Sequence, residues 1–547
     1  MRDVAEAARW MKLAGTPTER ESLRHFEAEL RALGFRTQVL THPAYISLPG
    51  AARVAVEGVD VTAITHSFSQ AAPEGGLAGD LIFVGRGQAA DYRGRDVAGK
   101  IVLVDGIATP EASMLAGGAC AAGQIHISPH EQRCEMCLSP VWGSPTQELR
   151  ERLPTTVVTT VSASDGMRLR DRLAETPLQA TLFTEVDTGW RETPILVGDL
   201  DCENAGAEEP FVLLSGHHDT WYYGVMDNGA ANATMLEIAR IVTDRRDAWR
   251  RSFRLCFWSG HSQGRYSGSA WYADAHWAEL ERRCVAHVNV DSTGGKDAVD
   301  LSGTASMSSL HALAKQAVEQ QAGQDYVGKR RGRAGDDSFG GIGVPSMFGP
   351  VSEQPKGGDN GRRNLGWWWH TPEDLADKVD ETNLVRDTRV VGHAVWRLLA
   401  DEVLPIDLTA LLRDLVRHLD PLLASPAARL LAEPILAAAS RLEASIGAAV
   451  LGRGGAGGVR ALNEAIRAAC RALVPVDYTS GDRFEHEPAL PVQAWPSLEP
   501  LRRLARETQT EDVPFRTVSA LRARNRLLHA LASASAAFDG ITAEPTL

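Results

Sequence analysis

The sequence has few cysteines, no excess of positive charge and no long apolar run. Seven cysteines among 547 residues are too few for a disulfide scaffold, and an odd number without an export signal is typical of a reducing cytoplasm. The formal net charge of −13 argues against a nucleic-acid-coating surface. No apolar run approaches the roughly 20 residues that a bilayer span needs, so no membrane partner is expected. The opening "MRDVAEAARWMKLAG" interrupts its apolar positions with charges, which predicts an amphipathic helix rather than a signal peptide.

The residue pattern changes three times and predicts four segments. Residues 1–50 predict a helix followed by a strand. Residues 51–188 hold short β-rich runs, such as "KIVLVDG", and one helical pattern, "ASDGMRLRDRLAE", which together predict an inserted β-domain. In residues 189–404 strands alternate with helices, and continuous apolar runs indicate an α/β sheet buried on both faces. Residues 405–547 predict a helical domain with a flexible joint at "GRGGAGG" (452–458).

Side chains of types that can bind metals follow the predicted strands of the α/β segment. They are His217 and Asp219 in "SGHHDTW", Asp227 in "VMDNGA", His261 and Ser262 in "GHSQG", Asp291 in "VNVD" and His370 in "WWWH". In open α/β sheets, sites gather at the carboxyl ends of strands. Zinc accepts histidine nitrogen and aspartate oxygen, and one carboxylate can bridge two ions. The pattern therefore predicts a divalent-metal site, although each residue alone could be an ordinary loop residue or, like Asp374 in "HTPED", a helix cap.

The stretch "GHSQG" (260–264) also has the G-x-S-x-G form of a serine-hydrolase nucleophile turn. The chain order Ser262, Asp291, His370 matches the order of the catalytic triad in α/β-hydrolases. Against this alternative, no oxyanion-hole motif such as HGGG lies upstream. A serine hydrolase would also leave "SGHHDTW" and "VMDNGA" without a role.

Five segments, in order, resemble the co-catalytic zinc aminopeptidases and carboxypeptidases, a family that includes glutamate carboxypeptidase and, as a non-enzymatic relative, the transferrin receptor. The segments are "MKLAGTPTERESLRHFEAELRALGF" for the opening helix, "DLIFVGRGQAADYRGRDVAGKIVLVDG" for a protease-associated domain, "SGHHDTWYYGVMDNGAANATMLEIAR" and "HTPED" for the first and last metal motifs, and "ALNEAIRAACRALVPVDYTSGDRFEHEPALP" for a helical dimerisation domain. The resemblance implies a mixed central sheet flanked by helices, with both additional domains, and a homodimer.

The resemblance also implies a ligand set. His217 and Asp291 would hold one zinc ion, Asp227 would bridge, and His370 would hold a second ion. Asp219 would orient His217, because ligating imidazoles usually donate their other N–H to such a partner. The expected cofactor is therefore Zn²⁺, as one or two ions, with Mn²⁺ or Co²⁺ as substitutes.

The chain departs from the family at "GHSQG". There the family has two glutamates, a general base and a ligand to the second zinc, whereas this chain has His261 and Ser262. Three outcomes are open. His261 can serve as base or ligand, because its pKa near neutrality suits proton transfer; a carboxylate such as Glu353 or Asp336 can complete the site; or hydrolysis is lost and the fold only binds. The prediction is an amide hydrolase acting on a short peptide or a small aminoacyl or N-acyl compound, with His261 handling the proton.

Several further residues could form the substrate pocket. Trp221, Tyr222 and Trp369 can either wall an apolar pocket or pack in the core. Asp336, in "GDDSFGG", is expected near the site. The run "GKRRGR" (328–333) could bind a substrate carboxylate or form a solvated loop. Cys134 and Cys137 have a metal-knuckle spacing without a second pair, which favours a loop with reduced thiols.

Overall fold

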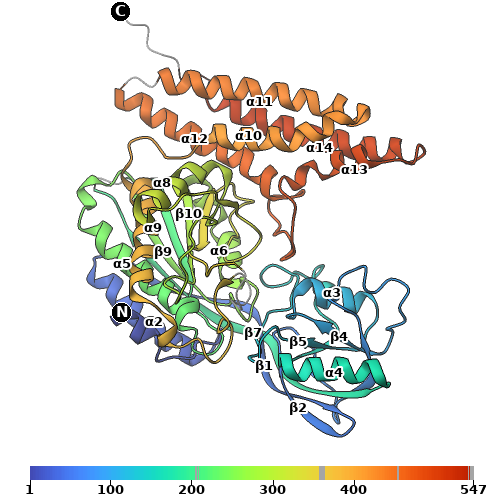
Figure 1. Ribbon diagram of the computed structural model, residues 1–547. Coiled ribbons are helices and arrows are strands. Elements are labelled where there is room, and N and C mark those ends of the chain that lie inside the picture. The colour runs from blue at the N-terminus through green and yellow to red at the C-terminus, as the bar shows by residue number, and fades with distance from the viewer. Residues whose placement is uncertain (204–205, 207, 357–363, 453–454, 540, 542–547) are drawn as a thin grey trace, which may run out of the picture.

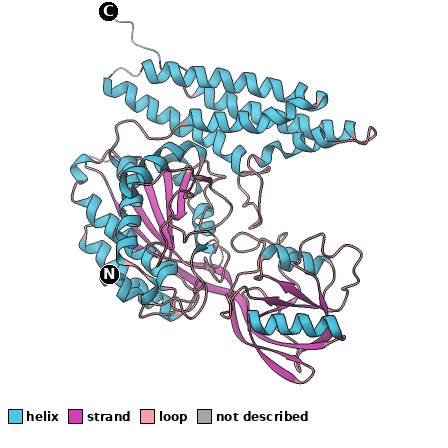
Figure 2. Ribbon diagram, viewed as in Figure 1, coloured by secondary structure: helices cyan, strands magenta, loops and turns pink. Residues whose placement is uncertain are grey.

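The computed structural model describes residues 1–547 except 204–205, 207, 357–363, 453–454, 540 and 542–547. An α/β domain, a smaller β-rich insert and a bundle of long helices are visible as separate bodies in Figure 1. Figure 2 shows strands in the first two bodies and helices alone in the third. The mixed α/β class expected from the sequence is confirmed.

Two long strands connect the α/β domain to the insert. Strand β1 (Arg36–Val56) and strand β7 (Gln179–Leu200) pair antiparallel along nearly their whole length, from Arg36 opposite Asp199 to Val56 opposite Ala180. At one end β7 pairs with β9 of the α/β domain, and at the other it pairs with β3 of the insert. Because this ribbon is continuous, the insert is joined to the main sheet by backbone hydrogen bonds.

Parallel strands form the centre of the α/β domain. The strands are β8 (Phe211–His217), β9 (Ser252–Trp258), β10 (Cys284–Asp291) and β13 (Ser346–Pro350), with the short β11 (Ala305–Ser306) and β12 (Lys329–Arg330) at the edge. Every residue of β8, β9 and β10 is buried, as the continuous apolar runs predict. Since β8, β9 and β10 run parallel, their carboxyl ends lie at one edge of the sheet.

Helices cover both faces of this sheet. They are α1 (Arg2–Ala7), α2 (Pro17–Ala32), α5 (Ala231–Thr243), α6 (Ser267–Ala275), α7 (Trp277–Arg283), α8 (His311–Ala322) and α9 (Glu381–Ala400). Helix α2 begins as the sequence predicts, with the Thr16 side chain accepting the N–H of Glu19 and Pro17 in the first turn. Residues 268–283 form two helices, α6 and α7, which meet at His276.

The insert is a small α/β unit rather than a purely β one. Its strands are β2 (Val59–Thr65), β3 (Leu77–Phe83), β4 (Ile101–Asp105), β5 (Gly123–Ile127) and β6 (Val157–Val161), and its helices are α3 (Pro110–Gly118) and α4 (Ala163–Glu175). Helix α4 coincides with the predicted "ASDGMRLRDRLAE". Helix α3 was not predicted, because "PEASMLAGG" has little apolar periodicity.

The C-terminal helices are α10 (Leu408–Leu419), α11 (Pro426–Gly452), α12 (Gly455–Tyr478), α13 (Glu499–Arg506) and α14 (Val513–Ala536). The flexible joint predicted at residues 452–458 is mostly helical. Helix α11 runs through Gly452 and α12 starts at Gly455, and residues 453–454 lie outside the described residues. By length and composition alone, α11 could cross a membrane, a possibility that the sequence analysis did not find. The same test is passed by buried core helices, and α11 packs against α14 and α10.

Candidate functional site

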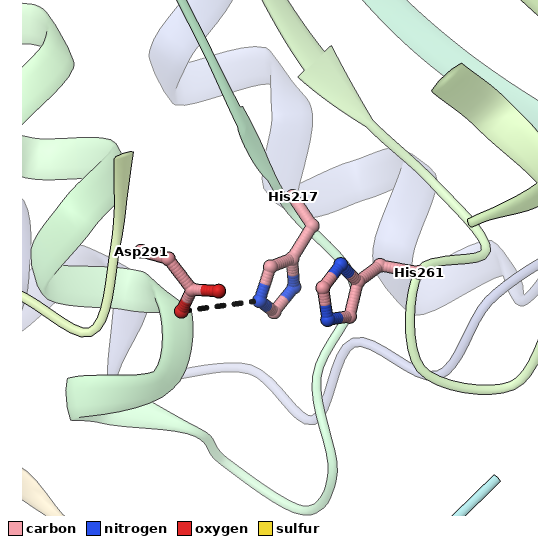
Figure 3. Close-up of side chains that lie close together, drawn as sticks. All are labelled: His217, His261 and Asp291. Carbon is pink, nitrogen blue, oxygen red and sulfur yellow. Dashed lines mark ion pairs between the residues drawn. The ribbon is translucent and has the colours of Figure 1, made fainter. Parts of the chain in front are cut away.

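The carboxyl edge of the sheet gathers the predicted ligand residues. His217 and Asp291 are the last residues of β8 and β10, and His261 lies in the turn that follows β9. In Figure 3 these three side chains point toward a common space. One ligand-capable atom from each residue lies within 4.8 Å of those of the other two. Ser292 Oγ donates to Asp291 Oδ1 at 2.9 Å and so fixes that carboxylate.

Asp227 lies between two imidazoles. It belongs to the turn Val225–Ala230, which precedes α5, and it is 7% exposed. Its Oδ1 lies 3.1 Å from Nε2 of His217, and its Oδ2 lies 3.2 Å from Nε2 of His370. Each carboxylate oxygen therefore faces a different histidine, which is the arrangement that a bridging ligand requires.

The other ring nitrogen of each histidine is held by the main chain. His217 Nδ1 donates to the carbonyl of Asp219 at 2.7 Å, and His370 Nδ1 donates to the carbonyl of Glu135 at 2.7 Å. A proton held on Nδ1 leaves the lone pair of Nε2 for a metal. Glu135 comes from the insert, so that domain helps to orient His370.

The charges of these groups depend on one another. Burial opposes a charge on His217, but Asp227 and Asp291 raise its pKa to about 10. Burial alone would raise the pKa of Asp227, but His217 and His370 hold it well below the ordinary value. Carboxylates that stay ionised in a buried site need a cation beside them. A zinc ion held by His217, Asp227 and Asp291 would satisfy that need, and His217 Nε2 lies 3.1 Å from Asp227 Oδ1 and 3.9 Å from Asp291 Oδ1.

His261 forms a pair with Asp336. Its Nδ1 lies 2.8 Å from Asp336 Oδ2, and Asp336 is 1% exposed. Burial would raise the pKa of Asp336, but His261 and His217 lower it below its usual value. The His261 ring also stacks on the His217 ring, with centroids 3.7 Å apart and planes 13° from parallel. Because the two rings are nearly parallel, their in-plane lone pairs lie in separate, nearly parallel planes.

The carboxylate of Asp219 has different partners from those that the sequence analysis predicted. Its backbone carbonyl, not its carboxylate, contacts His217. The carboxylate accepts the main-chain N–H groups of His261 at 3.0 Å and Ser262 at 2.8 Å. Among the described residues, no hydrogen bond joins the Ser262 hydroxyl to a histidine, so the structure gives no support to a serine nucleophile.

A cavity of about 370 Å³ opens beside these residues. It is lined by all three parts of the chain: Thr109, Pro110, Glu111, Met136 and Cys137 from the insert; Trp221, Asp227, His261, Ser262, Arg265, Tyr266, Asp291, residues 332–335, Pro350, Leu365, Trp369 and His370 from the α/β domain; and Ala489, Leu490 and Pro491 from the loop between α12 and α13. Trp221 and Trp369 therefore line the cavity as predicted.

Other predicted residues do not reach the cavity. The Tyr222 hydroxyl donates to Glu135 at 2.9 Å, and Asp336 stands behind His261. Glu353 pairs with Lys329 and does not complete the metal site. Within the described part of the chain, no metal-type cluster includes Cys134 or Cys137, and both cysteines are free.

Two arginines lie in the cavity wall, and sequence reasoning missed one of them, Arg265. Arg265 donates to the carbonyls of Cys137 and Ser139, and Arg333 donates to those of Asp337 and Glu487. Neither pairs with a carboxylate among the described residues. Arg333 lies in "GKRRGR", where the run of charges was a usable signal, whereas nothing in the local pattern marks Arg265.

Three comparisons with known proteins bear on this site. Residues 196–395 match the model of peptidase family M28. A probable glutamate carboxypeptidase from Zea mays is 25% identical over 501 residues, which cover 75% of this chain and 68% of that protein. Among solved structures, a peptidase M28 precursor from Shewanella amazonensis (TM-score 0.57, 18% identity) and a zinc aminopeptidase from Bacillus subtilis (TM-score 0.56, 20% identity) each cover 73% of this chain, and 92% and 95% of their own chains.

The fold, the family match and these relatives define a hydrolase of the metallopeptidase type. Residues 196–395 match the model of that family, and the resemblance to co-catalytic zinc peptidases is thereby confirmed. The segment matched includes His217, Asp227, His261, Asp291 and His370. Zinc is the cofactor that this family implies.

Proposed function

We propose that the protein hydrolyses an amide bond in a short peptide or a small aminoacyl or N-acyl compound, with His217, Asp227, Asp291 and His370 as metal ligands. One observation carries this proposal: Asp227 faces the Nε2 atoms of two histidines whose Nδ1 atoms are both fixed by backbone carbonyls. When bound, zinc supplies an activated water molecule and polarises the scissile carbonyl.

We propose one tightly bound ion rather than two of equal affinity. His217, Asp227 and Asp291 offer one nitrogen and two carboxylates to the first ion. A second ion would have only His370 and the shared Asp227 as strong ligands, because a neutral hydroxyl at Ser262 binds zinc poorly. Manganese and cobalt are expected to substitute, because their ligand preferences overlap with those of zinc.

His261 takes the proton in this proposal. Asp336 only accepts hydrogen bonds when ionised, so it keeps the proton of the neutral imidazole on Nδ1. The other nitrogen, Nε2, then has a free lone pair at the cavity wall, beside the lone pair of His217. The near-parallel stacking favours His261 as a base that acts next to the metal, since parallel rings do not aim their lone pairs at one ion.

The cavity suggests the kind of substrate. Trp221, Trp369 and Tyr266 supply apolar surface. Arg265 and Arg333 form no ion pair with a described carboxylate, so an acidic group on the substrate would be favoured there. The name glutamate carboxypeptidase, which belongs to the Zea mays relative, agrees with such a substrate.

We further propose a cytoplasmic homodimer whose insert is a protease-associated domain, without nucleic-acid or membrane partners. An exposed stripe on α11 supports dimerisation. Leu430, Ala437, Ala444 and Leu451 repeat every seven residues on the solvent side, and Leu430 and Leu451 are 72% and 89% exposed. Small and apolar residues at this spacing suit the close approach of a second helix.

The test combines metal analysis with turnover. Purified protein is assayed on aminoacyl and N-acyl p-nitroanilides, with and without a carboxylate on the substrate, before and after chelation. About one zinc per chain and turnover that chelation abolishes are expected. Turnover that survives complete metal removal would contradict the proposal, and metal binding without any turnover would favour a binding homologue.

A further inference from the structure

Two buried carboxylates each hold a pair of consecutive main-chain N–H groups beside the site. The first is Asp374, which is 2% exposed. Its Oδ1 accepts the N–H of Met226 at 2.9 Å, and its Oδ2 accepts that of Asp227 at 3.0 Å. Its own carbonyl accepts the N–H of Val225 at 3.2 Å. One residue thus fixes three successive residues of the turn that presents the Asp227 carboxylate.

The second is Asp219, which is fully buried. Its Oδ1 accepts the N–H of His261 at 3.0 Å, and its Oδ2 accepts that of Ser262 at 2.8 Å. Gln263, the next residue, donates to the carbonyl of Thr220 at 3.0 Å and accepts the N–H of Ala14 at 2.9 Å. The segment 219–220 therefore contacts three successive residues of the turn that carries His261.

A buried ammonium group faces these two carboxylates. Lys12 is fully buried, and its Nζ donates to the carbonyls of Ala7, Trp10 and Tyr223 at 3.1 to 3.2 Å. Burial lowers its pKa to about 8, and the facing charges of Asp374 and Asp219 oppose that fall. A buried carboxylate that bonds two N–H groups and has a cation nearby makes a strong, rigid contact.

We propose that the two carboxylates divide the positioning of the site between them: Asp374 positions Asp227, a proposed metal ligand, and Asp219 positions the turn that carries His261. Neither residue lines the cavity, so both are positioning residues. For Asp219 this differs from orienting His217 through its carboxylate, since the backbone carbonyl already does that. The division rests on the proposed roles of Asp227 and His261.

Asparagine variants test this division. Asn keeps the shape of Asp, but it places an NH₂ group against one of the two N–H donors. Asp374→Asn is expected to weaken zinc affinity by about 10- to 100-fold, the usual effect of losing a ligand's supporting contact, and excess zinc is expected to restore turnover. Asp219→Asn is expected to keep zinc affinity within about threefold and to lower kcat at least about tenfold, with no rescue by zinc.

Zinc affinity is measured by competition with a chromogenic chelator, and turnover on the p-nitroanilide panel is measured at saturating zinc. A second readout needs no activity: modification of His261 by diethyl pyrocarbonate, followed by mass spectrometry, should become faster in Asp219→Asn and remain unchanged in Asp374→Asn. The control is Asp477→Asn, a fully buried carboxylate in α12 that pairs with Arg330. It should change neither property.

Equal losses of zinc affinity in both variants would overturn the division. The division would also be overturned if both variants kept wild-type zinc affinity, turnover and labelling and differed from the wild type only in a lower melting temperature. Should Asp374→Asn fail to fold, Asp374→Glu keeps the charge, shifts the oxygens by one methylene and should weaken zinc to the same degree. If the wild type binds zinc but turns nothing over, the proposed function fails, while the affinity and labelling measurements still decide the division.

Discussion

Replacing Asp336 by asparagine removes a charge from behind His261 while keeping the volume of the side chain. Asp336 is 1% exposed, and its Oδ2 lies 2.8 Å from His261 Nδ1. An ionised carboxylate can only accept, so the imidazole proton stays on Nδ1. An asparagine can instead turn its NH₂ group toward Nδ1. The proton then moves to Nε2, and the nitrogen that faces the cavity loses its lone pair.

The expected loss of rate follows from the proposed role of His261 as a general base. A positioned general base contributes about 10²- to 10⁴-fold to a rate. Because His261 would be in the wrong tautomer for much of the time, kcat of Asp336→Asn is expected to fall within that range, which corresponds to about 3–5 kcal/mol in the activation barrier. Zinc content should not change, since no described hydrogen bond or ion pair joins Asp336 to His217, Asp227 or Asp291.

The assay is hydrolysis of the most reactive p-nitroanilide of the panel, with zinc content measured on the same samples. Asp337→Asn is the matched control, because Asp337 is equally buried and adjacent in sequence, but it pairs with Arg331. A loss of less than tenfold in Asp336→Asn with full zinc content would refute the role of the pair. An equal loss in Asp337→Asn would point to general damage of the loop.

Three further predictions concern the metal, the serine and pH. Chelation should abolish turnover, and zinc should restore it. Zinc at 100 times its Kd should stabilise the fold by about 2.7 kcal/mol in urea denaturation. An unchanged urea midpoint would contradict metal binding. Ser262→Ala should keep its turnover, and a fluorophosphonate should not label the wild type; labelling at Ser262 would revive the serine-hydrolase alternative. In the metal-free protein the pKa of His217 is raised from the ordinary 6.5 to about 10. Its stabilising contribution is therefore complete below about pH 6.5 and lost as pH rises toward 10, so urea midpoints should fall over that window. Zinc, which replaces the proton, should flatten the profile, and a flat metal-free profile would contradict the ion pair.

The strands that carry the site were predictable because they are buried on both faces. The run "CVAHVNVD" coincides with β10, and "SFRLCFWS" contains the whole of β9. Once parallel strands are assumed, their last residues must meet at one edge, which brings His217 and Asp291 together. The position of Asp227 was predictable because its turn precedes α5, whose helical pattern is strong.

The supporting contacts could not be predicted, because they join residues far apart in sequence. Asp374 holds a turn almost 150 residues earlier, and Glu135 reaches His370 from another domain. Local pattern identifies an aspartate near a helix as a cap and cannot reveal which N–H groups it will meet. The same limit explains Asp219, where the sequence suggests contact with His217 but not whether the carboxylate or the carbonyl makes it.

The G-x-S-x-G pattern of residues 260–264 has a steric cause in this fold. Gly260 has a φ of +73°, and a Cβ atom there would collide with Ser267 Oγ. A Cβ on Gly264 would come within 2.5 Å of the same oxygen and 2.7 Å of Ile46 Cδ1. Both glycines are therefore required by the close packing of this turn against α6 and β1, whatever residue lies between them. The pattern thus says nothing about a serine nucleophile; what the turn presents to the cavity is His261, backed by Asp336.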